Sequence, residues 1–189
     1  MEFMFYRCVF LDIINLASFN TKNVTHMNYM FCNCQNLQEL DLSSFNTSNV
    51  KNMSNMFDSC HNLNKLNISS FDTKNVEIFW ALFAGCFNLR NIDLSFINTQ
   101  NATNIGAMFS HCPKLESIDL SSFDTKNVTE MENMFCGCEN LKSIDLSSFD
   151  TKNVTRMEDM FWGCENLKKI KVKKNSFKDY YEDSRFIYI

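Results

Sequence analysis

The feature that most constrains this chain is a repeat of 26 residues that continues without insertion or deletion. A phenylalanine recurs at every step, at Phe5, Phe31, Phe57, Phe83, Phe109, Phe135 and Phe161. A cysteine follows three residues later, at Cys8, Cys34, Cys60, Cys86, Cys112, Cys138 and Cys164. A threonine column runs Thr21, Thr47, Thr73, Thr99, Thr125 and Thr151. Such regularity predicts a repeat architecture in which each unit buries its apolar side only against its neighbours.

Each unit has two halves with different apolar spacing. Over residues 141–149, the alternation around Ile144 and Leu146 favours a short strand. Over residues 153–164, apolar residues recur at i, i+3, i+6, i+7 and i+10, which keeps one stripe on a helix. Asn and Thr residues before this stripe supply helix N-caps. We therefore expect an α/β fold with parallel strands on one face and helices on the opposite face.

The unit resembles a known repeat family. Leu141-x-x-Ile144-x-Leu146 resembles the leucine-rich repeat, and the string LKSIDLSSFDTKNVTRMEDMFWGC at 141–164 resembles the 26-residue repeat of BspA-like bacterial surface proteins. The resemblance covers residues 1–172. It implies an α/β leucine-rich-repeat-like solenoid of about seven strand-helix units, displayed on a cell surface or secreted, with adhesion or host interaction as its function.

The chain departs from that pattern in two respects. Phenylalanine stands at Phe45, Phe71, Phe123 and Phe149, where the ordinary leucine-rich repeat has Asn or Cys. The sequence also contains no recognisable secretion signal or wall anchor, so a cytoplasmic location is the alternative.

The two ends suggest the limits of the array. Met1 already occupies a column position, so either the chain is a fragment of a longer array or its first residues are an unusual cap. After Val172 the pattern fades, and lysines at 171, 173 and 174 replace the Asp and Ser residues of earlier units. We therefore predict a solenoid over residues 1–172, its first unit partial, and a C-terminal cap over residues 173–189.

Charge and composition exclude several function classes. The net charge is −4 and most lysines are dispersed, so nucleic acid is not an expected partner. Every apolar run is interrupted by a polar residue well before the 18 to 20 residues that a spanning helix needs, so we expect no membrane span. The three histidines sit in three different columns and the chain has only four glycines, so we expect neither catalysis nor a cofactor.

Nine cysteines raise the question of disulfides or zinc. Cys32/Cys34 and Cys136/Cys138 form Cys-x-Cys pairs, but residues two apart on a helix point to different faces. We expect the seven-member cysteine ladder to consist of buried free thiols acting as small apolar groups, with disulfides or zinc as the alternatives.

A row of acidic and amide residues recurs on the predicted strand face, at Asn15, Asp41, Asn67, Asp93, Asp119 and Asp145. At the spacing of strands, about 4.8 Å, neighbouring carboxylates repel unless water, serine hydroxyls or a cation compensate. A solvated face with serine partners is the main interpretation, and calcium bridging is the alternative.

The fourth unit loses its polar residues at several outward positions. Ile78, Trp80 and Phe87 stand where other units have polar residues or small ones, and Phe96 replaces a serine. These residues predict an exposed apolar patch, which would contact a partner or a second copy of the chain. The alternative is a local repacking of the fourth unit.

Together these features predict a non-enzymatic binding or adhesion module. Its partner would be a protein or a glycan, recognised by the fourth-unit residues Ile78, Trp80, Phe87 and Phe96 and by Asp93, Asp119 and Asp145. The alternative is an intracellular structural or scaffolding repeat protein, or a truncated copy of a longer array.

Overall fold

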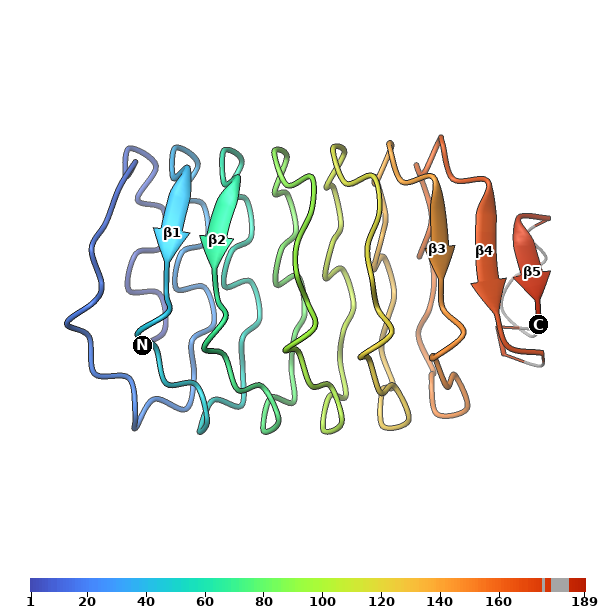
Figure 1. The fold of residues 1–189 in the computed structure, drawn as a ribbon, viewed down its shortest axis with the longest axis horizontal. Helices are drawn as coiled ribbons and strands as arrows, with labels where there is room; N and C mark the ends of the chain where they lie inside the picture. The colour runs from blue at the N-terminus through green and yellow to red at the C-terminus, as the bar shows by residue number, and fades with distance from the viewer. Residues whose placement is uncertain (175, 178–183) are drawn as a thin grey trace.

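The computed structural model describes residues 1–174, 176–177 and 184–189 of the 189-residue chain. The chain winds into a row of coils, each advancing by one 26-residue unit, from the N-terminal coil at one end to the C-terminus at the other (Figure 1). Equivalent side chains of successive coils are neighbours. The rings of Phe57, Phe83 and Phe109 stack almost parallel, with centroids 5.5 and 5.7 Å apart, as the period predicts.

Within the described residues, five short strands lie in two parallel sheets. The first sheet pairs β1 (Glu39–Asp41) with β2 (Lys65–Asn67), and the second has the order β3 (Ser143–Asp145), β4 (Lys169–Val172), β5 (Phe186–Tyr188). Equivalent residues of neighbouring units, 26 positions apart, lie opposite each other, so that Leu40 faces Leu66 and Ile144 faces Ile170. The central residue of β1 and β3 is buried and its two neighbours are exposed, which is the pattern of a strand with one face on the core.

The predicted α/β class is wrong, because no helix forms in the part of the chain that the structure describes. The half expected to be helical consists of turns joined to the next coil. N–H groups of alternate residues donate to carbonyl oxygens of the following unit, namely Ile105 to Glu130, Ala107 to Glu132, Phe109 to Met134 and His111 to Cys136, over 2.6 to 2.9 Å. In an α-helix these N–H groups would donate within their own segment. Parallel bridges run along the same side, from His26 through Asn52, Ile78, Asn104 and Glu130 to Arg156.

The spacing of the coils explains this outcome. Packed helices need interaxial distances of 8 to 10 Å, whereas strands lie about 4.8 Å apart. Two kinds of contact hold successive coils at a distance close to that between strands. Parallel backbone bridges run along one side, and in the core the rings of Phe57 and Phe83 stack at 5.5 Å. A row of helices does not fit at that spacing.

Backbone torsion angles show how the turns replace the helix. Each of the first seven units has two residues with positive φ, four positions apart; in one unit these are Ala107 and His111, at 52° and 56°. Positive φ interrupts a right-handed helix within each turn. Glycine occupies the second of the two positions at Gly85, Gly137 and Gly163, where it relieves the strain that an L side chain meets.

Polar columns fasten the coils to one another. The hydroxyl of Thr99, which is fully buried, donates to the carbonyl oxygen of Asp124 over 2.9 Å and accepts from the Asp124 N–H over 2.8 Å. The same double contact recurs from Thr21, Thr47, Thr73 and Thr125 to residues in the next coil. The threonine column is therefore a continuous hydrogen-bonded seam.

The cysteine ladder is buried except at Cys8, which is exposed. Its thiols are free, and each buried one donates to a phenylalanine carbonyl oxygen of the preceding unit, as from Cys112 to Phe83 over 3.1 Å. Burial raises the pKa of the Cys112 thiol to about 12. These thiols stay protonated at neutral pH and act as core residues.

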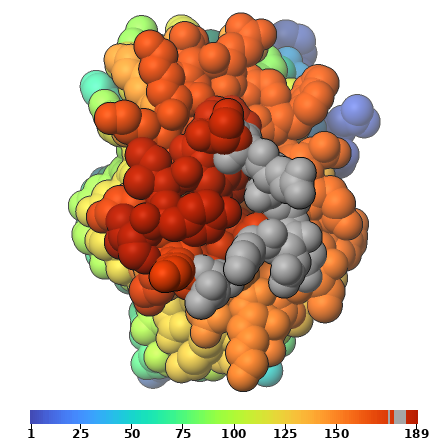
Figure 2. Space-filling model, turned by 90° about the vertical axis from the view of Figure 1, so that its right-hand side faces the viewer, coloured from blue at the N-terminus to red at the C-terminus, as the bar shows by residue number. Residues whose placement is uncertain are grey.

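The last strand closes one end of the stack. β5 pairs in parallel with β4, and the ring of Phe186 meets Phe161 edge to face and Phe177 at a tilt. Figure 2 looks onto this end and shows the C-terminal residues, in red, lying over the last coil. Residues 175 and 178–183 of the predicted cap lie outside the described residues, and the boundary at 172/173 stays a prediction.

Candidate functional site: the open strand face

The predicted acidic row lies where the strand segments end. One side-chain oxygen of each member accepts the backbone N–H two residues later, as from Ser95 to Asp93 and from Ser121 to Asp119, both over 2.9 Å. The same contact occurs at Asn15, Asp41, Asn67 and Asp145. The row therefore caps the turns that follow the strand segments. The donor is the backbone N–H of a serine, or of Ala17 at Asn15, and the serine hydroxyl that we expected as partner donates as well at Asn67.

These hydrogen bonds stabilise the charged form of the carboxylates. The backbone N–H of Ser95 is the main cause that lowers the pKa of Asp93, and that of Ser121 does the same for Asp119. Hydrogen bonds from Ser147 and Lys171 lower the pKa of Asp145 to about 2. Within the described ranges, no group of three or more His, Cys, Asp or Glu side chains is arranged to hold a metal ion.

Backbone pairing is interrupted in the middle of this face. The N–H of Leu42 donates to the carbonyl oxygen of Asn67 over 2.9 Å, and the N–H of Leu146 donates to Lys171 over 2.7 Å. The equivalent N–H groups of Ile68, Leu94 and Leu120 have no backbone partner among the described residues. Between β2 and β3, segments 91–94 and 117–120 consequently run side by side without forming strands (Figure 1).

The side chains at the strand centres are buried where the backbone pairs with the next coil and only half-buried where it does not. Leu40, Ile144 and Ile170 are buried, at 3, 4 and 0% exposure. Leu66 and the equivalent Ile92 and Ile118 are only half-buried, although they pack against the core. The middle of the face thus combines a row of accessible apolar side chains with unpaired backbone groups.

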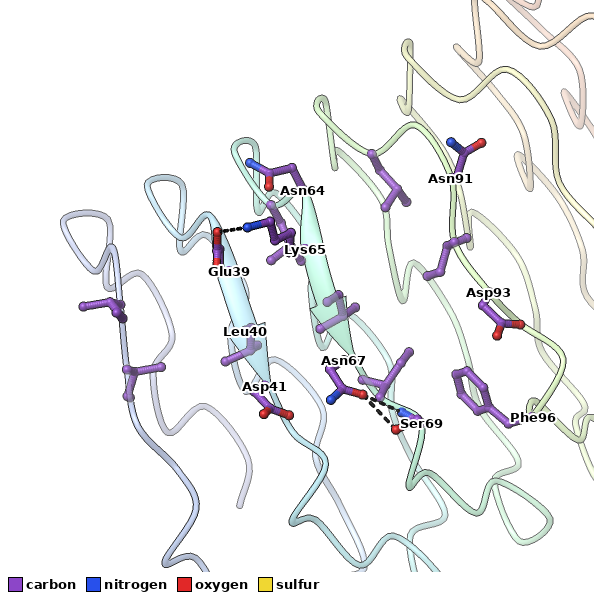
Figure 3. Close-up of a pocket in the computed structure, with 17 residues that line it drawn as sticks. Glu39, Leu40, Asp41, Asn64, Lys65, Asn67, Ser69, Asn91, Asp93 and Phe96 are labelled. Atoms are coloured by element: carbon purple, nitrogen blue, oxygen red, sulfur yellow. Dashed lines mark hydrogen bonds and ion pairs between the residues drawn. The ribbon is translucent and has the colours of Figure 1, made fainter.

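A groove of about 710 Å³ lies over the first part of this region. Its walls come from β1, from β2 and from residues 89–96 of the following coil. Figure 3 shows polar side chains of Glu39, Asn64, Lys65, Asn91 and Asp93 around it, with the ring of Phe96 at one end. A smaller hollow of about 410 Å³ continues over the next coil, lined by Ile92, Asp93, Leu94, Ser95, Asp119, Ser121 and Ser122. We call the groove and the hollow together the open strand face.

The charge pattern differs at one position of the strand segments. Lys171 lies opposite Asp145 in the paired strands, over 2.9 Å, whereas Asp93 and Asp119 are each followed by a further aspartate on the next coil, which disfavours close pairing. Opposite charges at other positions do not divide in the same way, because Lys65 contacts Glu39 over 2.5 Å in the paired strands and Lys142 contacts Glu116 over 2.9 Å beside an unpaired segment.

The sequence-predicted site residues fall into separate places. Asp93 and Phe96 line the groove, and Asp119 lines the hollow. Asp145 lies at the end of β3 and pairs with Lys171. Asp93 and Asp119 thus lie beside the apolar row, whereas Asp145 lines neither the groove nor the hollow.

The other fourth-unit residues do not join them. Ile78 is half-buried in the bridge row between Asn52 and Asn104. Trp80 is half-buried beside Gly106, and Phe87 lines a different groove with Trp162. The four apolar residues of the fourth unit therefore do not form one patch, although each can still contribute to a contact by itself.

Sequence reasoning missed Leu66, Ile92 and Ile118 as surface residues. They share one column with Leu40 and Ile144, which are buried, so residue type alone does not separate the two groups. The next residue does not separate them either, because the buried Leu40 and Ile144 are followed by an aspartate just as Ile92 and Ile118 are.

Comparison with known proteins gives a family. The family model described as "Mycoplasma protein of unknown function, DUF285" matches residues 1–118 and again residues 82–183. No curated protein matches the chain. None of the described residues forms a helix with the length and apolarity to cross a bilayer.

Proposed function

The chain belongs to the DUF285 family of Mycoplasma proteins of unknown function, and from this premise we propose that it is a non-enzymatic, BspA-like surface protein that binds a protein partner along its open strand face. The main support is that two features occur on the same coils. The backbone N–H groups of Ile68, Leu94 and Leu120 have no backbone partner within the described part of the chain, and the side chains two residues earlier, at Leu66, Ile92 and Ile118, are only half-buried.

An extended polypeptide matches this surface better than a glycan does. An extended peptide places alternate side chains into neighbouring hollows, and its main chain supplies hydrogen-bond donors and acceptors to the surface beneath it. The groove and the hollow beside Asp93 and Asp119 offer such hollows. In an adhesion role, this partner would be a protein on a host surface.

Cell-binding measurements test the proposal. Fluorescently labelled protein is titrated onto intact cultured mammalian cells, with Asn91→Arg as the variant and Lys126→Glu as the control. Asn91 is exposed at the groove, so an arginine obstructs the surface without entering the core, whereas Lys126 pairs with Asp124 in an exposed turn. We expect saturable binding that weakens by about tenfold in Asn91→Arg, as for a residue at the centre of an interface, and is unchanged in the control.

Pretreatment of the cells identifies the class of partner. Trypsin treatment is expected to abolish binding, and enzymatic removal of surface glycans is expected to leave it intact. The reverse result would indicate a glycan partner. Absence of saturable binding, or equal binding by both variants, would contradict a host-surface role for this face.

One observation favours a second candidate, an intracellular structural or scaffolding role. Eight of the nine cysteines are buried free thiols, which suits a reducing compartment. Biotinylation of intact cells with a membrane-impermeant reagent, followed by immunoblotting, separates the two: labelling favours the surface role and its absence favours the scaffold.

A further inference from the structure

A second groove lies on another edge of the stack and does not share a lining residue with the open strand face. It has a volume of about 630 Å³ and is lined by His61, Asn62, Phe87, Asn88, His111, Pro113, Lys114, Gly137, Glu139, Trp162, Gly163 and Glu165. We call it the edge groove. It spans the coils between Phe87 at one end and Trp162 at the other.

Two exposed aromatic rings mark its ends. Trp162 is 67% exposed and Phe87 is 42% exposed, whereas the other exposed large apolar side chains of the described residues lie near the two ends of the chain. The Phe87 ring is held in place because it stacks on His61 at 4.3 Å with only 2° between the planes. An exposed tryptophan in a groove is a common anchor for binding partners.

Glycines shape the floor at the Trp162 end. A Cβ added to Gly137 would lie 3.1 Å from the Nδ1 atom of His111, and one added to Gly163 would lie 3.4 Å from the Cα atom of Gly137. The coils are stacked closely here, and no side chain stands on the floor beside the indole. The close stacking of the coils beside Trp162 therefore accounts for glycine at these two positions.

Charges are divided along the edge groove. The Lys114 ammonium is held on the Phe87 side by a 2.5 Å hydrogen bond to the Asn88 side-chain oxygen. Glu139 and Glu165 occupy one column on successive coils near Trp162, and both are exposed. Neither carboxylate forms an ion pair with a described residue. The Trp162 end thus presents an aromatic ring and two negative charges.

We propose that the edge groove binds a cationic side chain of a partner polypeptide, arginine in particular, between the indole of Trp162 and the carboxylates of Glu139 and Glu165. A guanidinium stacks on an aromatic ring through cation–π attraction and donates to carboxylates at the same time. It also relieves the repulsion between the two glutamates. This site is independent of the function proposed for the open strand face.

Tryptophan fluorescence tests the site directly. The protein carries Trp80→Phe, so that Trp162 is the reporter, and the probe is a blocked pentapeptide with two arginines separated by glycine. We expect a saturable change in emission, and a dissociation constant raised about tenfold by the double substitution Glu139→Gln with Glu165→Gln. Calorimetry is expected to show a similar loss in Trp162→Ala, whose exposed side chain is not part of the core.

A matched control separates the site from general charge attraction. The double variant Glu77→Gln with Glu116→Gln makes the same change in net charge away from both grooves and should bind the peptide like the parent. Equal weakening in this control, or no saturable binding, would overturn the proposal. So would tighter binding of the same pentapeptide with glutamates in place of its arginines, or a saturable response to an oligosaccharide such as maltohexaose that survives the Glu139→Gln, Glu165→Gln substitution. The open-face variant Asn91→Arg should leave peptide binding unchanged.

Discussion

The indole of Trp80 lies directly beside Gly106 of the next coil. A Cβ built on Gly106 would approach the indole Cζ3 atom to 2.5 Å and the Cε3 atom to 2.7 Å. Gly106 is the position where other units carry Asn28, Ser54, Glu132 and Glu158. The absence of a side chain there makes room for the ring, so the substitution at 80 is accommodated by local packing.

The Trp80 and Gly106 pair predicts a strong energetic coupling. Gly106→Ala should lower the free energy of unfolding by about 1 to 3 kcal/mol, because the methyl group collides with the indole. In a Trp80→Ala background the same substitution should cost less than about 0.5 kcal/mol. Urea denaturation of the parent, the two single variants and the double variant measures both free-energy changes. Additive effects would mean that the ring does not lie over Gly106.

The phenylalanine row predicts the stability of the stack. Phe83→Ala removes a fully buried ring between Phe57 and Phe109, and should cost about 3 to 5 kcal/mol. Lys126→Ala alters an exposed side chain and should cost less than about 0.5 kcal/mol. Thermal melting followed by circular dichroism compares the two. Similar melting temperatures would show that Phe83 is not in the core.

The threonine seam predicts sensitivity to loss of one hydroxyl. Thr99→Val keeps the shape of the side chain but leaves the N–H and C=O of Asp124 without their partner, so we expect a loss of about 1 to 3 kcal/mol in chemical denaturation. Thr99→Ser should recover most of it. Thr103→Val, at an exposed threonine whose hydroxyl donates only to the carbonyl oxygen of Glu77, is the control and should cost about 0.5 kcal/mol or less. Equal effects at both sites would contradict a role for the seam.

The acidic row predicts a loss of stability in acid. The pKa values of Asp41, Asp93 and Asp119 are lowered in the folded chain, and that of Asp145 falls to about 2. A lowered folded pKa gives stability that is present above the unfolded value, near 3.9, and is lost as the pH falls through the folded value. The free energy of unfolding should therefore decline between about pH 4 and pH 2.

Amide substitution tests which groups cause that decline. The variant with Asp93→Asn, Asp119→Asn and Asp145→Asn keeps a side-chain acceptor for each turn, as Asn67 does in the natural row. It no longer titrates at these positions, so its stability should depend less on pH in that range. An unchanged slope would assign the acid sensitivity to other carboxylates.

The period predicted the stacking of equivalent residues but not the conformation between them. Apolar residues at i, i+3, i+6 and i+10 fit a helix, and they fit equally a chain of three-residue turns whose alternate N–H groups reach the next coil. One sequence feature did argue against a helix: three of the four glycines, Gly85, Gly137 and Gly163, share one repeat position. In the structure all three have positive φ. Spacing between coils, which decided the matter, is a property of the assembled stack.

Part of the open strand face was visible in the sequence. Asp93, Asp119 and Phe96, which the sequence predicts as candidate binding residues, line this face, and their role in binding stays a prediction. The apolar patch expected from Ile78, Trp80, Phe87 and Phe96 does not form. Trp80 packs beside Gly106 and Phe87 lines the edge groove, so neither lies with Phe96.

Amide hydrogen exchange tests the unpaired strand face most directly. Leu42, Ile68, Leu94, Leu120 and Leu146 occupy one column and differ in whether the N–H has a partner in the next coil. We predict slow exchange at Leu42 and Leu146, and exchange at least about tenfold faster at Ile68, Leu94 and Leu120. Uniform protection along the column would show a continuous sheet and would contradict the account.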